Sequence, residues 1–230
     1  LLMVCMSCLR PTCRLPRKET TMLVWIVGIA ASLVSLWAGY TEFYEGNLGQ
    51  PDYQVTAQVD DVEFRTYEPF VIATTQLAEP GDPGLKSGFR TLAGYIFGGN
   101  SPGEKIAMTA PVLQQNDPGE SLPMTAPVLQ TAEEMRMAFV MPKGRNLDNL
   151  PIPENAKVVL TNVDWGEAAA IEFSGRGNQE RFREAEQTLR QVLKDAGRLP
   201  SGPALYAQYN SPSAFPPLRR NEVIIPLAPK

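Results

Sequence analysis

The sequence predicts an α+β protein: a closed or nearly closed antiparallel β-barrel with two flanking helices, preceded by one apolar helix. Two observations predict this fold class. Strands, one amphipathic helix and further strands follow one another twice along the chain, which indicates an internal duplication of an α+β unit. Ahead of both halves, residues 22–39 are almost wholly apolar and carry no charge. We therefore expect one globular domain behind an N-terminal helix.

The first half begins with two short strands. Residues 62–67 alternate in polarity, as in a half-buried strand, and a second strand follows Pro69 over residues 71–75. Apolar residues then recur at helical spacing, which predicts a helix that ends at Gly98-Gly99. Alternating Met and Phe residues from 135 to 141 predict another strand. The expected buried face of the helix consists of Leu85, Phe89, Leu92, Ala93 and Ile96.

The second half repeats this order. Residues 157–163 and 168–173 have the composition of strands, and a helix is predicted from about residue 178 to residue 196. Residues 204–209 and 222–227 supply two last strands. Because helices must cover the apolar face of a sheet, two such halves can pair into one barrel.

The apolar segment is long enough to cross a membrane once. A helix of this length reaches roughly 30 Å, about the thickness of the hydrocarbon core of a bilayer. Basic residues precede the segment and acidic residues follow it, so the N-terminus is predicted to be cytoplasmic. A cleaved signal peptide is the alternative, although bulky Leu36 stands where cleavage after Ala38 needs a small residue.

These features predict a protein of the inner, or plasma, membrane whose C-terminal domain lies outside the cytoplasm. After signal cleavage, the alternative location is the periplasm or the medium. Because the chain begins with Leu and internal methionines follow, a translation start as late as Met22 is a further alternative. The expected divisions are a cytoplasmic segment over residues 1–21, a transmembrane anchor over 22–39, a tether over 40–52 and the globular domain over 53–230.

Composition limits the partners of the domain. The chain has a formal net charge of −4, and most of the basic residues that precede the apolar segment are not matched by acids there, so the domain itself is more acidic. Nucleic acid is therefore not an expected partner, because phosphate binding needs a basic surface. The only cysteines, Cys5, Cys8 and Cys13, precede the anchor, so no disulfide is expected in the domain.

Catalysis is not expected either. The chain contains no histidine, which excludes Ser-His and Cys-His pairs, and it has no nucleotide-binding glycine motif. Catalysis by two carboxylates, as in a glycosidase, is an alternative that the composition leaves open, but nothing in the sequence singles out two of them. A binding protein is the better hypothesis.

A second face of the first helix has the composition of a binding surface. Lys86, Arg90, Gly94 and Phe97 follow one another at helical spacing, so two cations lead to a position without a side chain and then to an aromatic ring. A flat apolar ligand with carboxylates, such as a tetrapyrrole, could lie over Gly94 and neighbouring Ala93 and pair its acids with the cations. The alternative is an ordinary solvated face with a glycine used for helix packing.

One short sequence occurs twice, as Met-Thr-Ala-Pro-Val-Leu-Gln at residues 108–114 and 124–130. Together with Gly-Phe-Arg-Thr-Leu-Ala-Gly-Tyr-Ile-Phe-Gly-Gly-Asn at 88–100 and Arg-Arg-Asn-Glu-Val-Ile-Ile-Pro-Leu at 219–227, it resembles the SOUL haem-binding protein family. The resemblance covers about residues 53–227. It implies an eight-stranded distorted barrel flanked by two helices, with pseudo-twofold symmetry.

The resemblance also implies a function: non-covalent binding of haem or a related tetrapyrrole, as a buffer or carrier. The alternative is a small-molecule effector or protein-interaction barrel that binds no haem, as in regulators of similar fold. Without histidine, haem would be held by hydrophobic contact unless Met108, Tyr95 or Tyr209 coordinates the iron. The residues that the resemblance places at the ligand, on the first helix and on the loop before the last strand, are Ser87, Arg90, Thr91, Gly94, Tyr209 and Phe215.

Two motifs are expected to be structural. The Met-Thr-Ala-Pro-Val segments have the composition of a Pro-interrupted barrel edge, in which Met108 fills the core. In Arg219-Arg-Asn-Glu222, a bidentate arginine bound to a carboxylate such as Glu222 or Glu68 would lock the last strand into the barrel. A contact from this motif to a propionate is the alternative.

Overall fold

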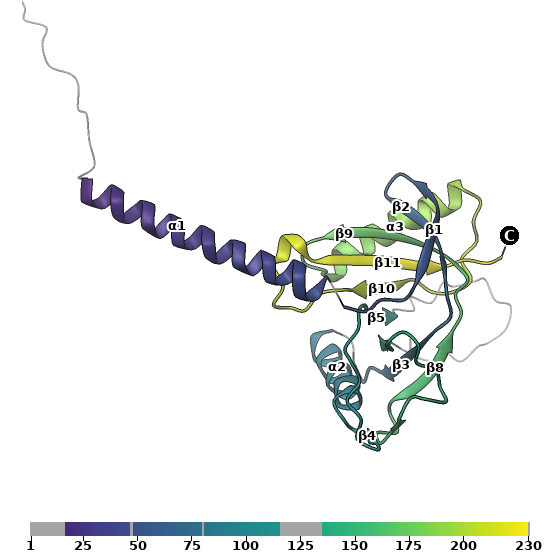
Figure 1. Ribbon diagram of the computed structural model, residues 1–230. Helices are drawn as coiled ribbons and strands as arrows, with labels where there is room; N and C mark the ends of the chain where they lie inside the picture. The colour runs from purple at the N-terminus through teal and green to yellow at the C-terminus, as the bar shows by residue number, and fades with distance from the viewer. Residues whose placement is uncertain (1–16, 47, 80, 116–134, 230) are drawn as a thin grey trace, which may run out of the picture.

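The computed structural model describes residues 17–46, 48–79, 81–115 and 135–229. A curled antiparallel sheet carries two helices, and a third, N-terminal helix projects from one end of the domain (Figure 1). The elements in chain order are α1 Arg17–Tyr40, a π-helical turn Thr41–Glu45, β1 Tyr53–Val59, β2 Val62–Tyr67, β3 Phe70–Gln76, α2 Asp82–Ile96, β4 Asn100–Ser101, β5 Val112–Gln115, β6 Arg136–Val140, β7 Ile152–Pro153, β8 Val159–Val163, β9 Glu167–Ser174, α3 Gln179–Asp195, β10 Leu205–Gln208, the 3₁₀ turn Pro216–Leu218 and β11 Arg220–Pro226.

Strands from both halves of the chain alternate in the sheet. The order is β1-β2-β9-β11-β10-β5-β6-β3-β8, and β4 pairs with β7 in a small separate sheet. The order from β2 to β8 is symmetric. Exchanging β2 with β8, β3 with β9, β5 with β10 and β6 with β11 gives the same order read from the other end. The sheet has nine strands among the described residues, against the eight expected, because β1 adds an edge strand beside β2. The end strands β1 and β8 are not paired with each other in the described part, so the curled sheet is open along this side.

The two domain helices cover separate parts of the convex face. α2 packs on β3 and β6, and α3 packs on β9 and β11. The side chains under α2 and those under α3 form two apolar clusters, with Leu92 and Ile96 prominent in the first and Leu189 and Leu193 in the second. Burying one apolar side chain of this size stabilises the folded state by about 1.5–3 kcal/mol. The helices predicted near residues 85–96 and 178–196 are thus both present.

Local sequence explains how each helix fits. The side chain of Asn178 accepts a hydrogen bond from the Arg181 amide at 2.9 Å and so caps the start of α3. In α2, a Cβ atom on Gly88 would lie 2.4 Å from the side chain of Leu77, so this glycine lets the helix approach the sheet. The residues of α2 that the sheet buries are Gly84, Gly88, Leu92, Tyr95 and Ile96.

One residue of the expected buried face of α2 is exposed instead. Phe89 is 42% exposed, and its ring makes an edge contact with Phe139 of β6. The prediction failed because it followed apolar residues alone, whereas the helix packs through its two glycines and Tyr95. Met108 is also not a core residue, since it is 38% exposed. The second Met-Thr-Ala-Pro-Val copy lies outside the described residues.

The concave face of the sheet is buried as well. Small side chains line much of it, including Ala138, Ala168, Ala170 and Ala207, and they pack with larger apolar residues in a third cluster. Beside them lies a group of charged and phenolic side chains from β2, from β11 and from the residue that follows β10. Both faces of the central strands are therefore covered, which a half-buried pattern did not predict.

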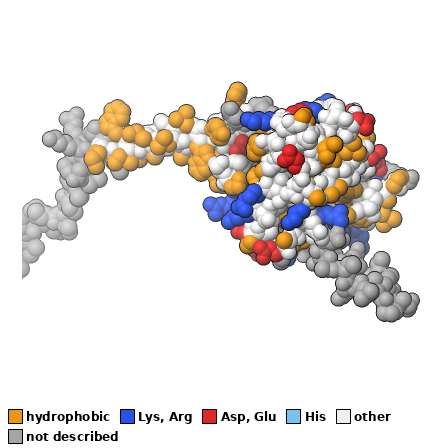
Figure 2. Space-filling view, turned by 90° about the horizontal axis from the view of Figure 1, so that it is seen from below, with side chains coloured by type: hydrophobic (Ala, Val, Ile, Leu, Met, Phe, Trp, Pro, Cys, Tyr) orange, Lys and Arg blue, Asp and Glu red, His pale blue; other side chains and the backbone are white. Residues whose placement is uncertain are grey.

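Helix α1 is apolar, and most of its described residues are exposed. Within it and the following turn, Val24–Phe43 is long and apolar enough to cross a membrane, and only 6% of it is buried. Figure 2 shows hydrophobic side chains along the length of the projecting helix. A signal sequence has the same length and composition, so this property alone does not separate an anchor from a leader.

The C-terminal end of α1 is fixed to the domain. The Trp37 indole donates to the Ser213 carbonyl oxygen at 2.8 Å, and its ring packs against Phe215 with centroids 5.0 Å apart. The buried hydroxyl of Thr41 accepts a hydrogen bond from the Phe215 amide at 2.9 Å. The first part of the expected tether over residues 40–52 is therefore helical and docked, because the loop before β11 supplies partners for it.

Candidate functional site

The exposed face of α2 carries most of the residues predicted to bind a ligand. Lys86, Ser87, Arg90, Gly94 and Phe97 are exposed, and Thr91 and Ala93 are half-buried beside them. The ring of Phe97, at the C-terminal end of the helix, is 61% exposed. The helix thus presents two cations, one aromatic ring and small residues on one surface.

Gly94 leaves this surface flat. Apart from the backbone of the helix itself, no atom of the described residues lies within 4 Å of the position that a Cβ atom would occupy on Gly94, in contrast to Gly88, which faces the sheet. A planar group could therefore approach the helix backbone here without displacing a side chain. Phe89 extends the apolar part of the surface, since the sheet leaves much of its ring exposed.

The two cations of this face are not neutralised by the described part of the protein. Neither Lys86 nor Arg90 makes an ion pair or hydrogen bond with another described residue. Both are therefore free to pair with carboxylates of a ligand, which a guanidinium binds in a bidentate manner. The arrangement can hold a flat, apolar, anionic molecule by contact and charge.

A buried ionic network occupies the concave side of the sheet. Arg65 on β2 donates to both carboxylate oxygens of Glu222 on β11, at 3.0 and 2.9 Å. Arg220 donates to the same carboxylate at 2.5 Å, and the Tyr209 hydroxyl donates to it at 2.6 Å. Arg65 also donates to the Tyr67 hydroxyl at 3.1 Å. Every polar atom of this group thus has a partner within the protein.

The network shifts the pKa values of its members. Burial alone would raise the pKa of Glu222, but the hydrogen bond and charge of Arg65, with the charge of Arg220, lower it. Burial raises the pKa of Tyr67 to about 12 against the opposing charge of Arg65. Burial and the neighbouring Glu222 carboxylate raise the pKa of Tyr209. A carboxylate held so firmly in its charged form is not suited to act as an acid or base near neutral pH.

This network confirms that an arginine binds Glu222, but the main partner was not predicted. The bidentate arginine is Arg65, which lies 157 residues away in sequence, and Glu68 takes no part. Arg220, from the predicted motif, contributes an additional contact. The sequence signal for Arg65 is its place on the polar face of the alternating strand 62–67. That pattern predicts solvent exposure of the face as readily as burial.

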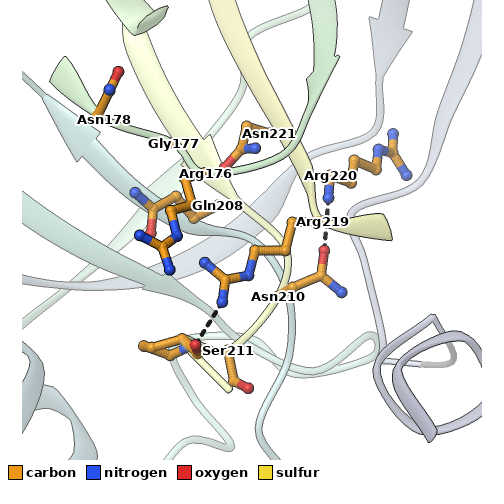
Figure 3. Close-up of a pocket in the computed structure, with 10 residues that line it drawn as sticks. Arg176, Gly177, Asn178, Gln208, Asn210, Ser211, Arg219, Arg220 and Asn221 are labelled. Carbon is orange, nitrogen blue, oxygen red and sulfur yellow. Dashed lines mark hydrogen bonds between the residues drawn. The ribbon is translucent and has the colours of Figure 1, made fainter. Parts of the chain in front are cut away.

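A separate cavity lies between the start of α3 and the loop that joins β10 to β11. Its volume is about 270 Å³, and it contains no residue of the predicted α2 surface. Figure 3 shows the residues that line it, among them Arg176 just before α3 and Arg219 just before β11. The lining residues are Arg176, Gly177, Asn178, Gln208, Asn210, Ser211, Pro212, Arg219, Arg220 and Asn221.

Comparison with known sequences identifies the family. A sequence model described as "SOUL heme-binding protein" matches residues 48–226. The chain belongs to the SOUL heme-binding protein family. No curated protein matches the SOUL chain closely enough to count as a relative.

Solved structures share the fold of this SOUL chain at low sequence identity. The C-terminal domain of EcmrR is 12% identical, with a TM-score of 0.54, and the match covers 77% of this chain and 99% of that one. An uncharacterised conserved protein from Listeria innocua is 12% identical, with a TM-score of 0.51 over 75% of this chain and 94% of that one. EcmrR in complex with DNA gives 12% identity and a TM-score of 0.53 over 93% of this chain and 71% of that one. At these identities the likeness shows the fold alone.

Two residues that the SOUL resemblance placed at the ligand are engaged elsewhere. The Tyr209 hydroxyl is buried against Glu222, and the Phe215 ring packs on Trp37 of α1. Tyr95, another possible iron ligand, is buried and donates to the Pro151 carbonyl oxygen at 3.0 Å. Met108 alone of the three proposed iron ligands is exposed.

The SOUL chain also lacks a metal-binding cluster in its described part. No group of three or more His, Cys, Asp or Glu side chains able to hold a metal ion occurs there. For a tetrapyrrole, the described surface of α2 offers a flat contact at Gly94 and two cations opposite its carboxylates. The free cations, the open position at Gly94 and exposed Phe97 fit such a group, and no imidazole is present in the sequence to hold its iron.

Proposed function

We propose that this SOUL protein binds haem or a related tetrapyrrole non-covalently on the exposed face of α2, as a buffer or carrier and not as an enzyme. The observation that carries the proposal is the surface itself: Arg90 and Lys86, which pair with no described residue, lie beside an open position at Gly94 and exposed Phe97. Membership of the SOUL heme-binding protein family supports the same ligand class. When bound, haem would supply its own iron chemistry, while the protein contributes apolar contact and charge neutralisation.

The buried interior supports a binding surface on α2 over one inside the sheet. Arg65, Glu222 and Tyr209 satisfy one another there, so a ligand in their place would have to break several charge-assisted hydrogen bonds. The outer face of α2 requires no such change. We also propose that the symmetric strand order reflects duplication of one α+β unit.

We further propose that α1 remains attached as a membrane anchor, with the domain outside the cytoplasm. The contacts of Trp37 and Thr41 with the loop before β11 support this, because cleavage at the predicted junction would remove part of them. Figure 1 shows α2 at the same end of the domain from which α1 projects. The proposed ligand surface would then lie toward the membrane, where amphipathic tetrapyrroles partition. A reporter active only outside the cytoplasm, fused after Lys230, tests this orientation.

Hemin titration of the full chain in detergent tests the ligand and the surface together. Arg90→Glu should weaken binding about tenfold or more, because repulsion replaces a charge-assisted contact to a carboxylate. Arg183→Glu is the matched control, since Arg183 is an exposed arginine on α3 and not on α2. Equal affinities for the parent and both variants would exclude the α2 surface. A different amphipathic molecule that co-purifies and blocks hemin would favour an effector function.

A further inference from the structure

The cavity beside the start of α3 is positively charged in a chain whose formal net charge is −4. Three arginines line it, and no carboxylate does. The charge of Arg220 is balanced by Glu172 at 3.0 Å and Glu222 at 2.5 Å. Arg176 and Arg219 have no carboxylate partner among the described residues. Two cations therefore remain to attract an anion.

The loop before β11 holds the side chain of Arg219 in place. Its guanidinium donates to the Pro212 carbonyl oxygen at 2.6 Å and to the Ala214 carbonyl oxygen at 3.1 and 3.0 Å. Nη1 is left without a partner in the described part of the chain. Arg176 lines the same cavity, and Figure 3 shows both side chains among the lining residues. Because the loop fixes Arg219 beforehand, an anion would not have to order that side chain.

The cavity also lies at the end of the hydrophobic helix. Ser211, in its wall, is bound to Glu45 just beyond α1, through the Ser211 amide at 3.0 Å and its hydroxyl at 2.6 Å. Phe43, at the end of the apolar segment, is 75% exposed, and Leu218 on the same loop as the cavity wall is exposed too. In a membrane, these apolar side chains would mark the boundary of the hydrocarbon region. Figure 2 shows Lys and Arg side chains at the end of the domain nearest α1.

We propose that this cavity binds the phosphate of an anionic phospholipid head group, whose acyl chains lie along α1. The inference rests on the proposed membrane anchor but not on haem binding. The volume of about 270 Å³ lies below the roughly 300–1,000 Å³ of sites for drug-sized ligands, so it suits a head group better than a whole tetrapyrrole. Arg176 and Arg219 supply the donors, as paired guanidinium groups do for phosphates elsewhere. The lipid would fix the rotation of the domain on the bilayer.

The test uses the full chain in nanodiscs of phosphatidylcholine, with or without phosphatidylglycerol. Native mass spectrometry after release from the disc measures which lipid the protein retains. The parent should retain phosphatidylglycerol over phosphatidylcholine, and Arg176→Gln should reduce this preference about fivefold. The Arg176 side chain is exposed and has no partner among the described residues, so its loss should leave the melting temperature unchanged. Arg183→Gln, the matched exposed arginine on α3, should behave like the parent.

Each of the following results would overturn the proposal. Equal retention of both lipids by the parent, or an equal loss in the Arg176 and Arg183 variants, would exclude a specific lipid site. A rise in melting temperature on addition of inorganic phosphate, in discs of phosphatidylcholine alone, would assign the cavity to a soluble anion instead if Arg176→Gln abolished it. Recovery of the chain cleaved after Ala38, seen in its intact mass, would overturn the anchor and the lipid site together. An intact anchored chain with no lipid preference would overturn the lipid site alone.

Discussion

Arg65 and Glu222 form a bidentate ion pair that joins β2 to β11 in the interior of the sheet, with the two side chains 2% and 0% exposed. β9 lies between these two strands, so the pair crosses the concave face above it. Buried ion pairs often add little net stability, because both ions lose their hydration. Breaking such a pair is costly all the same, since one charge is left buried and alone.

Glu222→Ala should therefore destabilise the protein by about 3–5 kcal/mol. Glu172→Ala is the control, because Glu172 pairs with Arg220 at the surface and should contribute under about 1 kcal/mol. Replacing both members, as Arg65→Met with Glu222→Leu, should recover most of the loss. Chemical unfolding of the full chain in detergent, followed by circular dichroism, measures all three. A loss for Glu222→Ala no larger than the control would contradict the structural role of the pair.

The lowered pKa of Glu222 predicts an acid-sensitive fold. In the unfolded chain this carboxyl has its ordinary pKa of 4.5, so the charged form is favoured more strongly in the native state. The resulting stability is present above pH 4.5 and is lost as the pH falls through the lower native pKa. Melting temperatures between pH 7 and pH 3 should fall less steeply for Glu222→Gln than for the parent. Identical slopes would mean that other carboxyls govern acid unfolding.

Gly94→Leu should weaken hemin binding while leaving the fold intact. The added side chain enters open space, so nothing in the described structure has to move. On the outside of α2 it would stand between the helix and a flat ligand. Gly88→Leu, on the opposite face, should instead destabilise the domain, because even a Cβ would crowd Leu77 there. Titration and melting curves of both variants separate the two effects, and unchanged binding by Gly94→Leu would refute a flat contact at this position.

Thr41→Val should loosen the junction between α1 and the domain. It removes the acceptor of the Phe215 amide hydrogen bond and leaves that amide without a partner. Hydrogen exchange of peptides covering residues 211–218 should become faster, while peptides from β9 should exchange as in the parent. Ser35→Ala, which removes a hydroxyl bound within the same helix, is the control. Equal exchange in both variants would show that the docked arrangement contributes nothing to the stability of the loop.

Much of the fold was predictable because its strands and helices have regular patterns. α2 and α3 lie where helical spacing placed them, and β2, β9 and β11 follow runs of β-branched, aromatic and small residues. β1 was missed although residues 53–59 alternate between apolar and polar side chains, and at the edge of the sheet all of them except Tyr53 are exposed. Local pattern determines which segments are regular, whereas the neighbours of each strand depend on the whole sheet.

The sites were harder to predict for a physical reason. The polar side of β2 was interpreted as solvent-facing, yet curling of the sheet buries it and joins Arg65 to a carboxylate far along the chain. Similarly, the polar residues after α1 have the composition of a tether, although Thr41 and Glu45 bind the loop before β11. Both relationships depend on contacts distant in sequence. The exposed cations of α2, by contrast, follow from helical spacing within one element.

The absorption spectrum of the full chain, as purified and during addition of hemin, tests haem binding most directly. We predict a Soret change that saturates at micromolar hemin and weakens in Arg90→Glu. The position of the band should be the same in Met108→Ala, since the ligand is held by apolar contact and charge and not by a thioether. No pigment and no Soret change at micromolar hemin would contradict the account.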